Sequence, residues 1–149
     1  MGLMELLNKE LIKVPMESVS KDKALEELVD VIDAAGMLKD RNEVLKAVME
    51  RELQQSTGLG EGIAIPHART EAVNGQVLCI GVAPGGIDFD ALDGRPSSLF
   101  FMILAPSDKA GAHIEVLSEI ARVTRSKAFC RLLLSAQSAE EVLELFQEE

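Results

Sequence analysis

The chain has 149 residues, of which 47% are hydrophobic and 27% charged, and its formal net charge is -10 at pH 7. This length fits one domain with a substantial hydrophobic core. The negative charge argues against non-specific nucleic-acid binding and against adhesion to an anionic membrane, because both need lysines and arginines to neutralise phosphates.

The first third of the chain predicts two helices. Ser20 is a candidate N-cap for the first helix, whose apolar residues share one face until Gly36 ends it. Asp40 and Glu43 resemble a capping box for the second helix, at about residues 41–54. The elements expected before these helices are a helical turn at residues 3–8 and a short strand at residues 11–14.

The centre of the chain predicts strands. Ile63-Ala64-Ile65 is expected to be extended, because β-branched residues flank an alanine, and Pro66 is expected to end its pairing. Residues 76–82 are expected to form a second buried strand, followed by a turn at Pro84-Gly85-Gly86. Residues 99–104, LFFMIL, are continuously apolar, as in a central strand buried on both faces.

The last third predicts helices at about residues 112–125, 127–134 and 139–147. Helices and strands therefore interleave along the chain, which predicts an α/β fold with a mixed sheet between helical layers. No apolar run approaches the length of a membrane span, and the N-terminus lacks the apolar region of a signal peptide. The two cysteines, Cys79 and Cys130, have apolar surroundings. We expect a cytoplasmic protein with reduced thiols, not inserted in a membrane.

The stretch from Ser56 to Arg69, STGLGEGIAIPHAR, contains the main candidate functional residue. His67 follows a strand and a proline, so a stiff backbone is expected to hold its side chain toward solvent. A histidine in this position is, taken alone, more often structural than catalytic. The glycines before the strand do not open a helix and no G-K-[ST] follows, which excludes a dinucleotide fingerprint and a P-loop. We expect them to allow close backbone approach or positive φ.

Two further side chains suit an anion. His113 is expected in the first turn of a helix, beside free backbone N–H groups. Arg51 continues the apolar stripe of its helix, so it is expected to face the protein, and its planar fork suits a phosphate or carboxylate. Each has a structural alternative: Arg51 paired with a carboxylate, and His113 serving only near the helix cap. The wide separation of His67 and His113, without a nearby cysteine, argues against a structural zinc site.

The run Gly60–Ala68, GEGIAIPHA, resembles the active-site signature of the fructose/mannitol-type enzyme IIA domains of the bacterial phosphotransferase system. The resemblance covers nearly the whole chain, with Arg51, His113 and the segment Ile87–Pro96 (IDFDALDGRP) in matching places. Within the family, the sequence is most similar to the nitrogen-regulatory IIA branch. The absence of fused IIB or membrane IIC portions from residues 1–149 also fits that branch.

The resemblance implies one EIIA type-2 domain with a mixed sheet of about five strands, flanked by helices on both sides. It implies that Nε2 of His67 accepts a phosphoryl group, that His113 hydrogen-bonds this group or orients the imidazole, and that Arg51 helps neutralise charge. Ala68 replaces a common family glycine at a position that tolerates small residues, and the role of Arg69 is left open. Neutral imidazole is a nucleophile near neutral pH and phosphoryl transfer depends on positioning and electrostatics, so no metal or bound cofactor is required.

Three functions are compatible with the sequence and with the resemblance. The first is a carrier in a regulatory, nitrogen-related phosphorelay. The second is a sugar-specific IIA subunit that passes phosphate to a separate IIB during uptake. The third is a regulatory binding module switched by phosphorylation of His67. The implied partners are an HPr-type phosphocarrier upstream, and a IIB domain or a regulatory target protein downstream.

Overall fold

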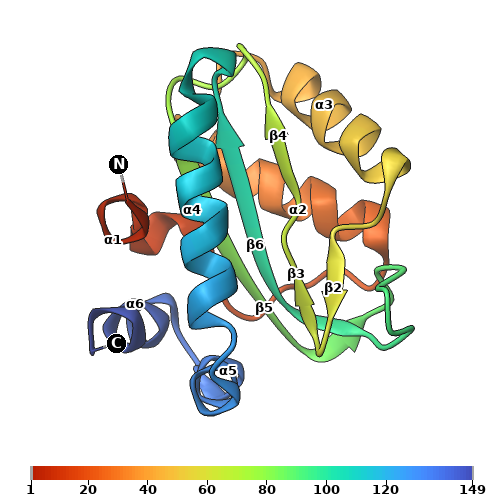
Figure 1. Ribbon diagram of the computed structural model, residues 1–149, viewed down its shortest axis with the longest axis vertical. Helices are drawn as coiled ribbons and strands as arrows, with labels where there is room; N and C mark the ends of the chain where they lie inside the picture. The colour runs from red at the N-terminus through yellow and green to blue at the C-terminus, as the bar shows by residue number, and fades with distance from the viewer. Residues whose placement is uncertain (1, 149) are drawn as a thin grey trace.

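The computed structural model describes residues 2–148 and contains a mixed six-stranded sheet with helices on both faces (Figure 1). The order of the main strands is β1 (Ile12–Lys13), β5 (Val77–Ile87), β6 (Ser97–Ala105), β3 (Ile63–Ala64) and β2 (Gly58–Gly60), while β4 (His67–Arg69) also pairs with β6. β5 and β6 are antiparallel, whereas β3 and β4 both run parallel to β6. The predicted α/β fold is confirmed, with six strands where about five were expected.

The helices lie close to the expected ranges, and they are α1 (Leu3–Leu6), α2 (Lys21–Ala34), α3 (Arg41–Gln54), α4 (Ala110–Val123), α5 (Lys127–Ser135) and α6 (Ala139–Glu148), with 3-10 turns at Lys9–Leu11 and Ser107–Lys109. Asp40 caps α3 as predicted, because its side chain accepts a hydrogen bond from the backbone N–H of Glu43 at 3.2 Å. Ser20 occupies the N-cap position of α2, but its side chain makes no capping hydrogen bond. No helix among residues 2–148 is long and apolar enough to cross a membrane.

The side chains of β6 alternate between two hydrophobic clusters, one on each face of the sheet. Phe100 and Met102 pack with residues of α2 and α3, whereas Phe101 and Ile103 pack with residues of α1 and α4–α6. Figure 1 accordingly shows α4 on one face of the sheet and α2 and α3 on the other. The expectation that this strand is buried on both faces is confirmed.

Two expectations about prolines were wrong. Pairing does not end at Pro66, because its carbonyl accepts a hydrogen bond from Ile103 N–H at 3.0 Å and β4 resumes at the next residue. Proline lacks a donor, but its carbonyl can still join the ladder. The Pro84-Gly85-Gly86 turn is instead part of β5, which continues to Ile87 through a shift in register after Val82. Such an irregularity lets the strand continue past a residue without an N–H.

Candidate functional site

His67 is the first residue of β4, and its side chain is half-buried. Its Nδ1 lies 2.8 Å from the carbonyl oxygen of Ile65. A carbonyl oxygen only accepts hydrogen bonds, so this contact requires the proton on Nδ1 when the ring is neutral. The lone pair is then on Nε2. Local backbone geometry therefore defines which nitrogen of His67 is nucleophilic.

His113 lies in the first turn of α4 and is 4% exposed. Its ring centroid is 5.7 Å from that of His67, and the two ring planes are inclined by 51°. Neither ring nitrogen of His113 has a hydrogen-bond partner among the described residues. Because buried polar groups nearly always have hydrogen-bond partners, this ring is suited to hydrogen-bond a ligand that also contacts His67.

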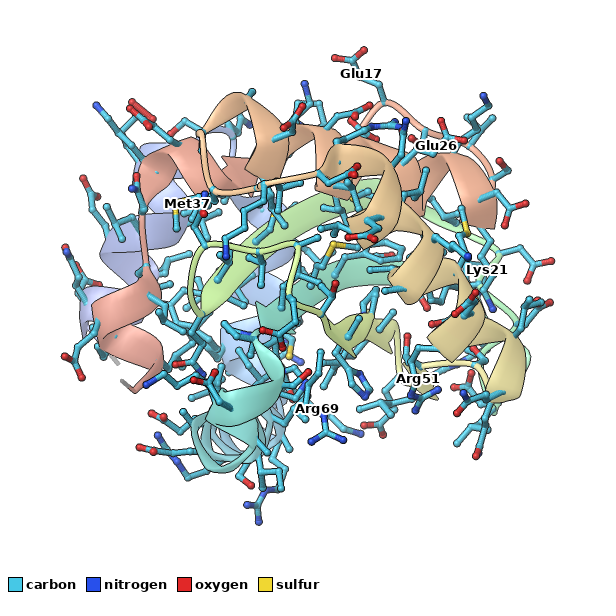
Figure 2. All side chains as sticks on the ribbon, turned by 90° about the horizontal axis from the view of Figure 1, so that it is seen from above. Glu17, Lys21, Glu26, Met37, Arg51 and Arg69 are labelled. Carbon is cyan, nitrogen blue, oxygen red and sulfur yellow. The ribbon has the colours of Figure 1, made fainter. Side chains whose placement is uncertain are left out.

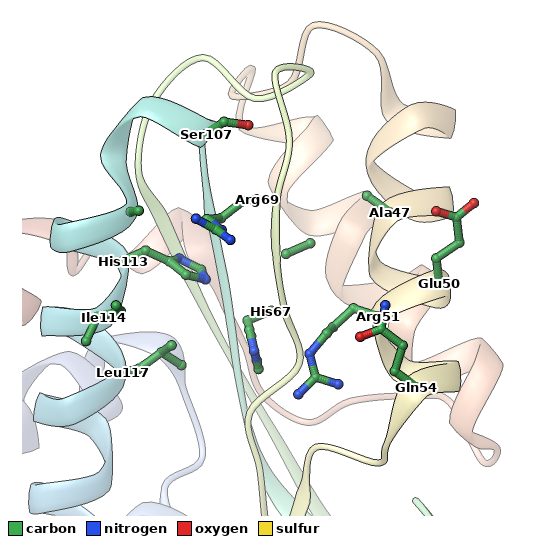
Figure 3. Close-up of a pocket in the computed structure, with 12 residues that line it drawn as sticks. Ala47, Glu50, Arg51, Gln54, His67, Arg69, Ser107, His113, Ile114 and Leu117 are labelled. Atoms are coloured by element: carbon green, nitrogen blue, oxygen red, sulfur yellow. The ribbon is translucent and has the colours of Figure 1, made fainter.

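Arg51 lies on the last turn of α3, where its Nη1 donates a hydrogen bond to the carbonyl of Gln55 at 2.9 Å. Figure 3 shows its guanidinium directed toward His67, on the side opposite His113. Within residues 2–148 it makes no ion pair with a carboxylate. The structural alternative, in which Arg51 pairs with a carboxylate, is therefore not found in the part of the chain that this structure describes.

These side chains line one cavity of about 720 Å³. It lies between α3 and α4, with β4 at its base (Figure 3). The structure thus brings His67, His113 and Arg51 together, as the resemblance implied. The remaining lining residues are Ala47, Glu50, Gln54, Ala68, Arg69, Ser107, Ala110, Ile114 and Leu117.

Arg69 belongs to the site by position. It follows His67 by two residues on β4, so both side chains leave the same face of the strand. Figure 2 shows Arg69 and Arg51 directed to the same side of the molecule, although they come from different elements. Arg69 therefore adds positive potential near the histidines.

Sequence reasoning missed Glu50, Gln54 and Ser107. The signal for the first two was present: Ala47, Glu50, Arg51 and Gln54 follow the i, i+3, i+4, i+7 spacing of one helix face. Ser107 precedes α4 in a 3-10 turn, and no periodic pattern marks such a residue.

The electrostatics of the cavity favour neutral imidazoles. Burial lowers the pKa of His67, and Arg51 lowers it further, whereas the Ile65 carbonyl and the Glu52 carboxylate oppose this shift. Burial, with the nearby His67 and Arg69, lowers the pKa of His113 to about 4. Both rings are therefore uncharged at neutral pH, which leaves a nucleophilic nitrogen next to two arginines.

The cavity suits an anion better than a metal cation. Arg51 and Arg69 repel cations and pair well with phosphate or carboxylate oxygens. Residues 2–148 contain no group of three or more His, Cys, Asp or Glu side chains arranged to hold a metal ion.

Residues 5–149 match the family described as "Phosphoenolpyruvate-dependent sugar phosphotransferase system, EIIA 2". The chain belongs to this family. The resemblance predicted from the GEGIAIPHA run is therefore confirmed, and the protein is an EIIA-type component of a phosphotransferase system.

Relatives of this EIIA protein include both sugar-specific and regulatory proteins. The fructose-specific EIIA component of Haloferax volcanii is 38% identical over 93% of this chain and 90% of its own length. The fructose-specific EIIABC component of Bacillus subtilis is 38% identical over 99% of this chain, but the chain spans only 23% of that protein. The nitrogen regulatory protein of Escherichia coli is 35% identical over 96% of this chain and 88% of its own length.

Solved structures agree with this assignment. The nitrogen regulatory protein IIA-Ntr from Neisseria meningitidis superposes with a TM-score of 0.88 at 35% identity, covering 96% of this chain and 97% of that one. Enzyme IIA of the E. coli mannitol system, solved in complex with phosphorylated enzyme IIB, has a TM-score of 0.81 at 25% identity and covers 96% of this chain and 98% of that one.

Proposed function

We propose that this EIIA protein is a phosphoryl carrier whose covalent intermediate is a phosphohistidine at His67. Nε2 attacks the phosphorus of a phosphorylated HPr-type carrier, the Nε2–P bond forms, and the bond between phosphorus and the carrier breaks. The observation that carries this proposal is the 2.8 Å contact of Nδ1 with the Ile65 carbonyl, because it leaves the lone pair on Nε2. The lowered pKa of His67 keeps that lone pair available at neutral pH.

The surrounding groups suit the charge of the transferred group. In-line phosphoryl transfer spreads negative charge over equatorial oxygens, so donors and cations placed around phosphorus lower the barrier. Arg51 supplies a bidentate donor on one side of His67, and the unpartnered ring of His113 supplies an N–H on the other. Arg69 contributes positive potential at the same cavity.

The phosphoryl group then passes to a IIB domain or to a regulatory target. A IIB domain as acceptor is supported by the solved complex of mannitol enzyme IIA with phosphorylated enzyme IIB. The regulatory alternative, a nitrogen-related relay or a switched binding module, is supported by relatives named nitrogen regulatory protein. The proposal includes a cytoplasmic location, in keeping with the free thiols of Cys79 and Cys130.

Intact-mass spectrometry tests the carrier function. The protein is incubated with phosphoenolpyruvate, enzyme I and an HPr-type carrier, with the variant His67→Ala treated in parallel. We expect one acid-labile phosphoryl group on the wild type and none on the variant. A folded wild type that stays unmodified with its cognate carrier would overturn the proposal.

A second measurement separates the downstream roles. Loss of sugar uptake in cells carrying His67→Ala would favour the transport role. Different bound proteins for His67→Asp and His67→Ala, with uptake unchanged, would favour the regulatory one.

A further inference from the structure

A series of hydrogen bonds, linked through the backbone of Ile65 and Thr57, connects His67 to a buried carboxylate on α3. Nδ1 of His67 donates to the Ile65 carbonyl at 2.8 Å, and Ile65 N–H donates to the Thr57 carbonyl at 3.0 Å. The N–H and the hydroxyl of Thr57 donate to the two carboxylate oxygens of Glu52, each at 2.7 Å. Three short links thus join the nucleophilic ring to Glu52.

Glu52 itself is held firmly. It is 7% exposed, and a carboxylate this buried is stable only when it is paired and hydrogen-bonded. Nζ of Lys21, at the start of α2, lies 3.1 Å from the same oxygen that accepts from Thr57 N–H. Lys21 also lies over the ring of Phe89, 4.8 Å from its centroid. The carboxylate therefore joins α2, α3 and the segment that leads into β2.

Glu52 directly follows Arg51 on the last turn of α3. Fixing Glu52 against Thr57 therefore fixes the helix turn from which Arg51 extends. The same contact fixes Thr57, whose carbonyl holds the residue that orients His67. One buried side chain is thus connected to both the nucleophile and the phosphate-binding arginine.

We infer that Glu52 is a positioning residue for phosphoryl transfer, which sets the orientation of the His67 ring through Thr57 and Ile65 and the place of Arg51 through α3. This inference rests on the proposed carrier function. The effect of Glu52 is chiefly positional, because the N–H and C=O groups used at Thr57, and likewise at Ile65, belong to different peptide units. Reacting groups displaced by even 1 Å lose on the order of 100-fold in rate, so such support matters for transfer.

The negative charge of Glu52 also supports phosphoryl transfer. It raises the pKa of His67 and so offsets part of the lowering caused by burial and Arg51. Removing the charge should make Nε2 a weaker base and a weaker nucleophile.

The test uses Glu52→Gln, which keeps the size of the side chain but removes its charge. Imidazole ¹⁵N NMR on the unphosphorylated protein reports the tautomer and the pKa of His67, and a separate assay measures the rate of phosphoryl acceptance. We expect a lower pKa, partial movement of the ring proton from Nδ1 to Nε2, and transfer slower by about ten-fold. Glu144→Gln, which removes an exposed carboxylate from α6, is the matched control and should leave all three values unchanged.

A second pair of variants covers the case in which Glu52→Gln does not fold. Thr57→Val removes only the hydroxyl that donates to Glu52, whereas Thr57→Ser retains it. The valine variant should slow transfer and shift the His67 tautomer, and the serine variant should restore both.

If Glu52→Gln and Thr57→Val lower only the melting temperature and leave the tautomer and pKa of His67 and the transfer rate unchanged, Glu52 is merely structural. That result would overturn the inference. Failure of the carrier function itself gives a different result. The wild type would then accept no phosphoryl group, while the NMR values of His67 would still respond to Glu52.

Discussion

The ring centroids of His67 and His113 lie 5.7 Å apart, and the ring nitrogens of His113 have no hydrogen-bond partner among residues 2–148. Both rings line the same cavity, so one bound group can contact both. His67 has its lone pair on Nε2, directed away from the Ile65 carbonyl, whereas His113 is a buried hydrogen-bond donor in the first turn of α4. This asymmetry supports the proposal that His67 makes the nucleophilic attack and that His113 stabilises the transferred group.

Replacing His113 with alanine should slow phosphoryl acceptance without preventing it. The variant keeps the nucleophile but loses a donor to the transferred oxygens, and loss of one such donor typically costs about 100-fold or more. Rapid-quench measurement of labelled phosphate transfer from the HPr-type carrier gives the rate. A rate equal to that of the wild type would exclude this role for His113.

Arg51 should not be replaceable by lysine. Arg51→Lys retains the charge but loses the planar fork, so we expect transfer slower by about ten-fold, and Arg51→Gln should be slower still. The same transfer assay applies, with the exposed Arg122→Gln as control for loss of a charge elsewhere. Equal rates for lysine and arginine would show that only the charge is needed.

Gly58→Ala should destabilise the fold near the site. A Cβ at Gly58 would lie 2.9 Å from the Cα of Ala91, a backbone atom that cannot move aside cheaply. We expect a loss of about 1–3 kcal/mol in the free energy of unfolding, typical of overpacking. Gly75→Ala, where a Cβ would meet no atom within 4 Å, is the matched control in urea denaturation. A Gly58→Ala protein as stable as the control would contradict this packing argument.

Acid should weaken the protein partly through His113. Its pKa falls from 6.5 to about 4 on folding, so between these values the unfolded chain binds more protons than the native one. Stability from this group is then fully present above pH about 6.5 and is lost as pH falls toward 4. The free energy of unfolding should therefore decline less steeply over this interval for His113→Asn than for the wild type. Parallel slopes would show that His113 does not titrate as described.

The sequence predicted much of the fold and indicated three candidate site residues. Periodic apolar residues indicated α2–α6 and the buried strand β6, because burial on one or both faces leaves a local pattern. His67, Arg51 and His113 were singled out from their places on the expected strand and helices, the resemblance gave them a common role, and the structure brings them to one cavity. The expectation for the glycines is confirmed as well: Gly58 is packed against Ala91, and Gly62 has a φ of 85°.

The remaining features depend on contacts between distant segments. Pro66 was expected to end pairing, but its carbonyl is used by Ile103, which lies far along the chain. The burial of Glu52 was likewise not predicted, since its partners Thr57 and Lys21 come from two other segments. Local propensity contains no information about such partners, so only the folded chain reveals them.

NMR of the phosphorylated, ¹⁵N-labelled protein tests the role of His67 Nε2 most directly. One-bond coupling between phosphorus and an imidazole nitrogen identifies the modified atom. We predict coupling to Nε2 of His67, with Nδ1 still protonated and hydrogen-bonded to the Ile65 carbonyl. Coupling to Nδ1 of His67, or to either nitrogen of His113, would contradict it.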